Sequence, residues 1–255
     1  MSLLGICSLP RATFGTKNRL NTNKATIIKA SFGVVNFVIG VRVTGDVNMA
    51  SVSVLGIDIS HHNGTIDFGK VAIDDIHFVL MKATESSSFV DSKFATNWQK
   101  SGQSNLKRGA YHFFRPNVSG KDQAKHFVSK LIAAGVGKGD IIPTVDCEDY
   151  DGSGAKAYQK ELQIFLDVVE GEFKKKPIIY TLRSFWKKIG DPIQFGGYPL
   201  WVVDLTSSDK PRLPSGWNDY AIWQFTFEGT TKGISGLVDK DRFNGDLSGL
   251  SSLII

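Results

Sequence analysis

The stretch from Ile141 to Asp149 (IIPTVDCED) places three acidic side chains at the end of an apolar, β-branched run typical of a buried strand. Strand interiors disfavour Asp, and burying an unpaired carboxylate is costly. Because side chains alternate across a strand, Asp146 and Glu148 share one face and Cys147 takes the other. Two carboxylates about 7 Å apart can divide the roles of a glycosidase, since the charge on one raises the pKa of the other. The alternative is structural: Asp146 caps a turn and Glu148 pairs with a surface Lys.

A second strand end carries polar residues of the same kind. The stretch GIDISHHNG (56–64) delivers Asp58 after apolar residues and follows it with a polar turn. His61 and His62 beside an Asp suggest a metal site, but adjacent side chains of an extended segment point in opposite directions. No Cys/His spacing typical of structural zinc occurs either. We therefore expect neither a metal ion nor a cofactor.

The elements that position these acids alternate in type from Ser53 onward. Alternation of strands with helices indicates a mainly parallel sheet, and about eight strands in this length are consistent with a closed barrel. Chemistry in such barrels gathers at the C-terminal ends of strands, which is where IIPTVDCED places its acids. The predicted strands are 54–59, 77–82, 109–114, 141–147, 177–181, 200–204 and 220–225, and the predicted helices are 91–103, 119–134, 155–175 and 184–189.

The first 52 residues differ in composition from the rest. They hold six of the 30 basic residues and one of the 25 acidic residues, so the net charge of +5 belongs to them and the remainder is neutral. This balance argues against a nucleic-acid partner. We interpret 1–52 as a leader or disordered extension and 53–250 as one catalytic domain; the alternative is that Met49 is the true start. The apolar segment 30–43 is shorter than the roughly 20 residues of a membrane span, so no span is predicted.

Eight motifs between Val54 and Gly245 resemble, in order and spacing, those of the glycoside hydrolase family 25 lysozymes, the Chalaropsis-type N-acetylmuramidases. The resemblance implies an α/β fold: a TIM-like irregular (β/α) barrel with eight strands and about five helices. It also implies hydrolysis of the β-1,4 bond between N-acetylmuramic acid and N-acetylglucosamine in bacterial peptidoglycan. We expect an extracellular monomer whose partner is that polymer. The motifs are GIDISHHNGTIDF, FVLMKATES, RGAYHFFRP, PTVDCED, PIIYTLRSFW, PLWVVDL, AIWQF and GLVDKDRFNG.

The same resemblance assigns roles to the acids. Glu148 resembles the general acid and Asp146 its neighbouring carboxylate, while Asp58 and Asp239 match the first and last Asp of the family pattern. Asp241 stands where the family often has Asn and is a lesser, substrate-binding candidate. Asp146 either attacks the anomeric carbon, which needs carboxyl groups about 5 Å apart, or stabilises an oxazolinium formed by the 2-acetamido group of the sugar. We favour the second, because a same-face pair spans more than that distance.

Three aromatic residues complete the predicted substrate-binding set. Tyr111, Trp201 and Trp223 lie at or near strand ends, where ring faces can stack on sugars. Core packing explains Trp223 equally well.

One motif departs from the family pattern and keeps a second function open. In LWVVDL, Val203 and Leu205 replace a small residue and a Tyr, and Asp204 is added. This change motivates an alternative, a catalytically silent glycan-binding protein on the same scaffold, although the presence of all the acids argues against it. A chitinase-like hydrolase is a third hypothesis, which an assay on chitin oligomers would separate.

Overall fold

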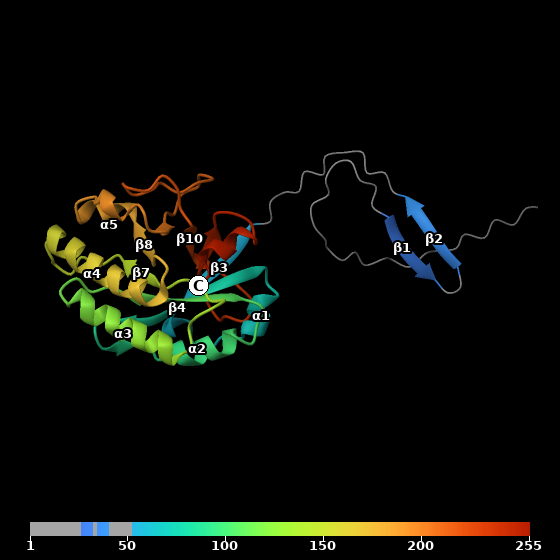
Figure 1. Ribbon diagram of the computed structural model, residues 1–255, viewed down its shortest axis with the longest axis horizontal. Coiled ribbons are helices and arrows are strands. Elements are labelled where there is room, and N and C mark those ends of the chain that lie inside the picture. The colour runs from blue at the N-terminus through green and yellow to red at the C-terminus, as the bar shows by residue number, and fades with distance from the viewer. Residues whose placement is uncertain (1–26, 33–34, 41–52) are drawn as a thin grey trace, which may run out of the picture. The chain divides into compact units, whose positions relative to one another are not determined.

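The computed structural model describes residues 27–32, 35–40 and 53–255 of the chain (Figure 1). Within the predicted leader, β1 (Ile27–Phe32) and β2 (Val35–Gly40) pair as an antiparallel hairpin. The sequence predicts no strand there. The rest of the prediction for 1–52 lies outside the described residues.

The remaining strands form a closed barrel. Each neighbour pair from β3 through β4, β6, β7, β8 and β9 to β10 is parallel, and β11 closes the ring by running antiparallel to both β10 and β3. A short strand, β5 (Phe89–Val90), extends the sheet beyond β4. In residues 53–255 the barrel thus has eight strands, the number that the family resemblance implies, and its sheet is mixed. They are β3 (Val54–Ile59), β4 (Ile76–Glu85), β6 (Lys107–Phe113), β7 (Thr144–Cys147), β8 (Ile178–Leu182), β9 (Leu200–Val203), β10 (Ile222–Gly229) and β11 (Val238–Phe243).

The helices lie outside the barrel, where α3 and α4 pack side by side (Figure 1). The four predicted helices are present: three are shorter than predicted, and the fourth, predicted at 184–189, keeps its length but begins one residue earlier. The helix predicted at 91–103 begins only at Phe94, because the Asp91 carboxylate accepts from the His61 and Lys93 N–H groups. The described α-helices are α1 (Phe68–Ala72), which was not predicted, α2 (Phe94–Ser101), α3 (Gly120–Ala133), α4 (Ala155–Phe173) and α5 (Arg183–Lys188); 3-10 helices are η1 (His61–Asn63), η2 (Ile193–Phe195) and η3 (Gly249–Leu253).

The core has two layers. One lies between barrel and helices, and the other fills the barrel with side chains such as Phe78, Ile178 and Phe243. Gly56 makes room for the inner layer, since a Cβ there would lie 2.3 Å from the Phe78 ring. The interior below the strand ends is therefore packed, which leaves the mouth of the barrel as the place for chemistry.

No helix in the described ranges combines the length and the hydrophobicity that crossing a membrane requires.

Candidate active site

A cavity of about 180 Å³ opens at the C-terminal ends of the parallel strands. A larger hollow, about 380 Å³, lies near the N-terminal ends of β9 and β10, but Asp219 is the one acidic residue in its lining. The four predicted catalytic acids instead all line the smaller cavity, so we place the chemistry there. Its lining residues are Asp58, Ser60, His62, Lys82, Tyr111, Phe113, Asp146, Glu148, Tyr180, Trp201 and Asp239.

The DxE pair comes from the end of β7. Asp146 is buried, and its Oδ1 has no hydrogen-bond partner among the described residues. Burial raises the pKa of Asp146 well above its ordinary value, and the Glu148 charge adds to that shift. Glu148 is exposed at the mouth, and its pKa is raised by partial desolvation and then by Asp149. Cys147 is buried in the outer core layer, which confirms the predicted alternation of faces.

A second pair of carboxylates enters from two paired strands. Asp58 of β3 and Asp239 of β11 are direct partners in the antiparallel register. Burial raises the pKa of Asp58 well above its ordinary value, followed by the charges of Asp241 and Asp239. Burial also raises the pKa of Asp239, to about 6. Because β11 runs against its neighbours, the start of this strand meets the ends of the others at the cavity.

Two residues that sequence reasoning missed hold Asp58 in place. The Gln224 side-chain amide donates to Asp58 Oδ2, and its Oε1 accepts from the Tyr180 hydroxyl at 2.7 Å. Gln224 is buried, and Tyr180 lines the cavity. A third missed residue is Lys82, whose charge inside the apolar run FVLMKATES was a signal available in the sequence.

Asp241 lies deeper in the barrel than the four catalytic candidates. It is paired opposite Gly56, it is fully buried, and it does not line the cavity. Its Oδ1 accepts from Trp201 Nε1 at 2.8 Å. Burial raises its pKa well above the ordinary value. This geometry makes Asp241 a support for the Trp201 ring, which itself faces the cavity.

The predicted aromatic residues separate into two groups. Tyr111 and Trp201 line the cavity with their ring centroids 6.1 Å apart, and Tyr180 packs against Trp201 at 4.5 Å. Trp223 instead lies in the outer core layer, 3% exposed, and its Nε1 donates to the backbone oxygen of Asp204 at 2.8 Å. The structure thus places Trp223 outside the cavity, in line with the packing alternative.

The three residues that depart from the family pattern in LWVVDL, Val203, Asp204 and Leu205, do not line the cavity, although Trp201 of the same stretch does. Asp204 binds Arg212 through both carboxylate oxygens, at 2.6 Å to Nη2 and 3.0 Å to Nε. These hydrogen bonds lower the pKa of Asp204. Leu205 is exposed and Val203 is buried in the inner core layer. The added Asp therefore orders a surface loop.

The two adjacent His residues take different surroundings. His61 Nδ1 lies 2.7 Å from Asp91 Oδ2, whereas His62 faces the cavity. Among the described residues, no group of three or more His, Cys, Asp or Glu is arranged to hold a metal ion.

Comparisons with known proteins identify the family of the chain. The model of glycosyl hydrolases family 25 matches residues 57–234. The uncharacterized protein YegX of Escherichia coli K12 is 34% identical, covering 80% of this chain and 75% of that protein. Lysozyme M1 of Streptomyces globisporus is 32% identical, covering 78% and 71%. The structure of a Streptomyces coelicolor lysozyme aligns with a TM-score of 0.74 at 30% identity, covering 79% and 96%. The chain thus belongs to glycosyl hydrolases family 25 and is a glycoside hydrolase.

Proposed function

We propose that the chain is a lysozyme that hydrolyses the β-1,4 bond between N-acetylmuramic acid and N-acetylglucosamine in bacterial peptidoglycan, outside the cell. One observation carries the proposal: Asp146 and Glu148 leave the same strand end and face one cavity with a second acidic pair and aromatic rings. The family and the lysozymes among its relatives support the same substrate.

In this proposal Glu148 is the general acid. Its raised pKa favours the protonated form that a general acid needs, and its position at the mouth lets it reach the leaving oxygen. As the glycosidic bond breaks, the Glu148 proton passes to that oxygen. A water molecule later attacks the anomeric carbon and returns a proton to Glu148, which restores the enzyme.

Asp146 stabilises the positive intermediate between these two steps. The carbonyl oxygen of the 2-acetamido group attacks the anomeric carbon, and the resulting oxazolinium nitrogen bears positive charge. The buried, unpartnered Oδ1 of Asp146 is an acceptor for the N–H of that group. Direct attack by Asp146 is the alternative, and it requires carboxyl groups about 5 Å apart. Asp58 and Asp239, with Tyr111 and Trp201, hold the sugar.

The test is the clearing of purified peptidoglycan by the full chain, with mass spectrometry of the new reducing ends. We expect Glu148→Gln to lower the rate by about 100-fold or more, because general acid catalysis contributes at least that factor. Asp146→Asn should also be impaired, whereas Glu172→Gln, an exposed change on α4, should match the parent. Muramic acid should occupy the new reducing ends.

Three results would contradict the proposal. A parent chain that binds the wall without clearing it would be the silent glycan-binding protein. Cleavage of chitin oligomers alone would indicate a chitinase-like enzyme. Full clearing by Glu148→Gln would remove the general acid from the mechanism.

A further inference from the structure

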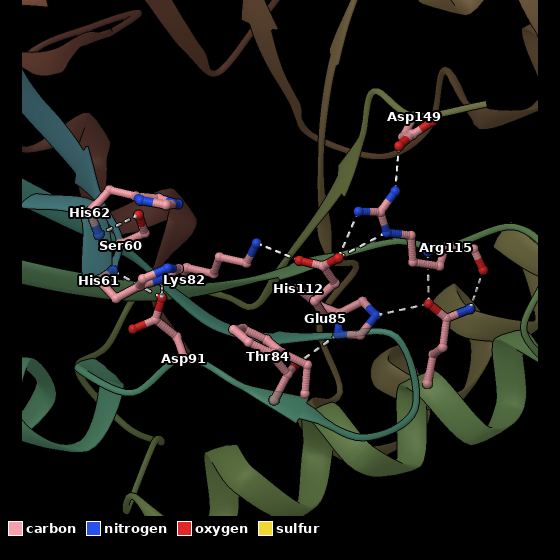
Figure 2. A network of polar contacts seen from close by, with 12 residues as sticks. Ser60, His61, His62, Lys82, Thr84, Glu85, Asp91, His112, Arg115 and Asp149 are labelled. Carbon is pink, nitrogen blue, oxygen red and sulfur yellow. Dashed lines mark hydrogen bonds and ion pairs between the residues drawn. The ribbon is translucent and has the colours of Figure 1, made fainter. Parts of the chain in front are cut away.

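A chain of alternating charges borders the cavity and is not explained by the proposed mechanism (Figure 2). Lys82 Nζ lies 2.7 Å from Glu85 Oε2. The other oxygen of Glu85 accepts from Arg115 Nε at 2.9 Å and from Nη2 at 2.7 Å. Arg115 Nη1 donates in turn to Asp149 Oδ2. We call Lys82, Glu85, Arg115 and Asp149 the ion-pair chain; it joins the ends of three strands.

The backbone of Arg115 is anchored by a buried side chain. Its backbone N–H donates to Gln123 Oε1 and its carbonyl accepts from Gln123 Nε2, both at 2.8 Å. Gln123 is fully buried and contacts His112, whose other ring nitrogen lies 2.7 Å from the Thr84 hydroxyl oxygen. Burial lowers the pKa of His112 to about 3, so this support is neutral. These hydrogen bonds fix the backbone from which the Arg115 side chain extends.

The Phe113 ring adds a further support for the cations. The Arg115 guanidinium carbon lies 4.6 Å from the centroid of this ring, and Lys82 Nζ lies 4.7 Å from it. Phe113 lines the cavity and pairs with Asp146 in the register of β6 and β7. The Phe114 N–H also donates to the Asp146 carbonyl at 3.0 Å. Arg115 therefore follows directly on the strand end that abuts the DxE pair.

The charges that face the general acid come from several elements. Lys82 and Arg115 lower the pKa of Glu148, whereas Asp149 and, from β11, Asp239 raise it.

Asp146 faces a similar set of charges. Its pKa is raised by Glu148 and Glu85 and lowered by Lys82 and Arg115. The positively charged side chains of Lys82 and Arg115 thus lower the pKa values of both acids of the DxE pair.

We propose that Arg115 is a positioning residue: bound to Glu85 and Asp149 at once, it holds the segment carrying Glu148 and fixes a positive charge beside the DxE pair. This inference rests on the proposed role of Glu148. A purely structural ion pair between strands would not depend on which partner carries the positive charge. In this proposal it does, because Arg115 lowers the pKa of Glu148 and its ion-pair partner Asp149 raises it.

The opposite effects of Arg115 and Asp149 on the pKa of Glu148 can be tested. The measurement is the pH profile of kcat and KM for the full chain on soluble peptidoglycan fragments. Arg115→Gln removes a positive charge, so the pKa of Glu148 rises and the alkaline limb moves to higher pH, by about half a unit or more. Asp149→Asn removes a negative charge while Glu85 still holds Arg115, so the limb moves to lower pH. Arg115→Lys should keep the limb of the parent, with kcat still reduced about tenfold because an ammonium lacks the guanidinium fork.

A matched control exists on β6, the strand that precedes Arg115. Arg108 binds Asp140 at 2.8 Å and stacks on the Trp98 ring at 4.3 Å, near the opposite end of β6. Arg108→Gln should lower the melting temperature without moving the alkaline limb. The inference fails if Arg115→Gln and Asp149→Asn both lose activity and their alkaline limbs either stay in place or move in the same direction. It also fails if Arg115→Lys shifts the alkaline limb as far as Arg115→Gln does. If Arg115→Gln does not fold, the other two variants still decide.

A second readout separates this inference from the proposed function. The carboxyl ¹³C resonance of Glu148, identified by its loss in Glu148→Gln, titrates whether or not the chain turns over substrate. The same opposite shifts in Arg115→Gln and Asp149→Asn are expected in that titration. If the parent clears no peptidoglycan, the proposed function fails, and the titration still supports or overturns the role of Arg115.

Discussion

Asp239 shows how one residue in the cavity controls the ionisation of others. Its pKa of about 6 makes it largely charged at neutral pH. That charge raises the pKa values of both Asp58 and Glu148. Because a general acid must carry its proton, Asp239 extends the pH range in which Glu148 can act.

We expect Asp239→Asn to move the alkaline limb of the activity profile to lower pH. Loss of the charge lowers the pKa of Glu148, so Glu148 loses its proton at a lower pH than in the parent. The measurement is kcat/KM against pH on soluble peptidoglycan fragments. Asp209→Asn, in an exposed loop, is the control. An unchanged or raised midpoint in Asp239→Asn would contradict this account.

At the scale of residues, the sequence predicts the acids of the cavity better than the side chains that hydrogen-bond to them. The DxE pair and Asp58 follow from strand ends and side-chain alternation. Tyr180, Gln224 and Asp58 form one hydrogen-bonded series from three strands, with partners 44 and 166 residues apart in the chain. Such a series depends on which strands become neighbours, and local patterns of side chains do not reveal that pairing.

At the scale of elements, the predictions were best where apolar runs were continuous. The strand predicted at 141–147 begins only at Thr144, because Pro143 has no N–H to donate and Ile141 instead bridges to Ile254. Strand β11 (VDKDRF) was missed, because four of its six side chains are charged. Two of those charged side chains point into the barrel: Asp239 lines the cavity, and Asp241 accepts a hydrogen bond from Trp201.

The contact between α3 and α4 depends on one glycine. A Cβ on Gly120 would lie 2.0 Å from the backbone oxygen of Glu161, so Gly120→Ala must push the two helices apart. We expect the free energy of unfolding in urea to fall by about 1–3 kcal/mol. Gly171→Ala in α4 meets nothing within 4 Å and should gain about 0.5–1 kcal/mol. Equal stability of the two variants would refute the close approach.

At the scale of the whole molecule, residues 249–255 cover the end of the barrel opposite the cavity, which we call the floor. Leu250 and Leu253 of η3 are buried in the inner core layer. The Ile142 N–H donates to the Leu253 carbonyl at 2.8 Å, and the Ile255 N–H donates to the Asp140 carbonyl at 2.9 Å. The last residues thus hold the end of the barrel opposite the cavity.

Leu253→Ala should therefore weaken the fold and spare the chemistry. We expect a loss of about 2–5 kcal/mol in the free energy of unfolding, with specific activity at 25 °C unchanged. Leu247→Ala, whose parent side chain is 55% exposed, should stay within about 0.5 kcal/mol of the parent. Urea unfolding and peptidoglycan clearing measure the two quantities. A loss of activity in folded Leu253→Ala would contradict this prediction, because it would show that packing at the floor affects the acids in the cavity.

The buried acids also determine how this protein would respond to selection for heat resistance. Burial raises the pKa values of Asp58, Asp146 and Asp241 above the ordinary 3.8, so the folded state binds protons more tightly than the unfolded chain. Their contribution to stability becomes less favourable as the pH rises from 3.8 towards neutral. Screening variants at neutral pH for thermal tolerance alone would enrich neutral residues at these positions and eliminate the enzyme while keeping its barrel. Engineering a robust form should therefore retain activity as a second criterion and direct changes to the helical exterior.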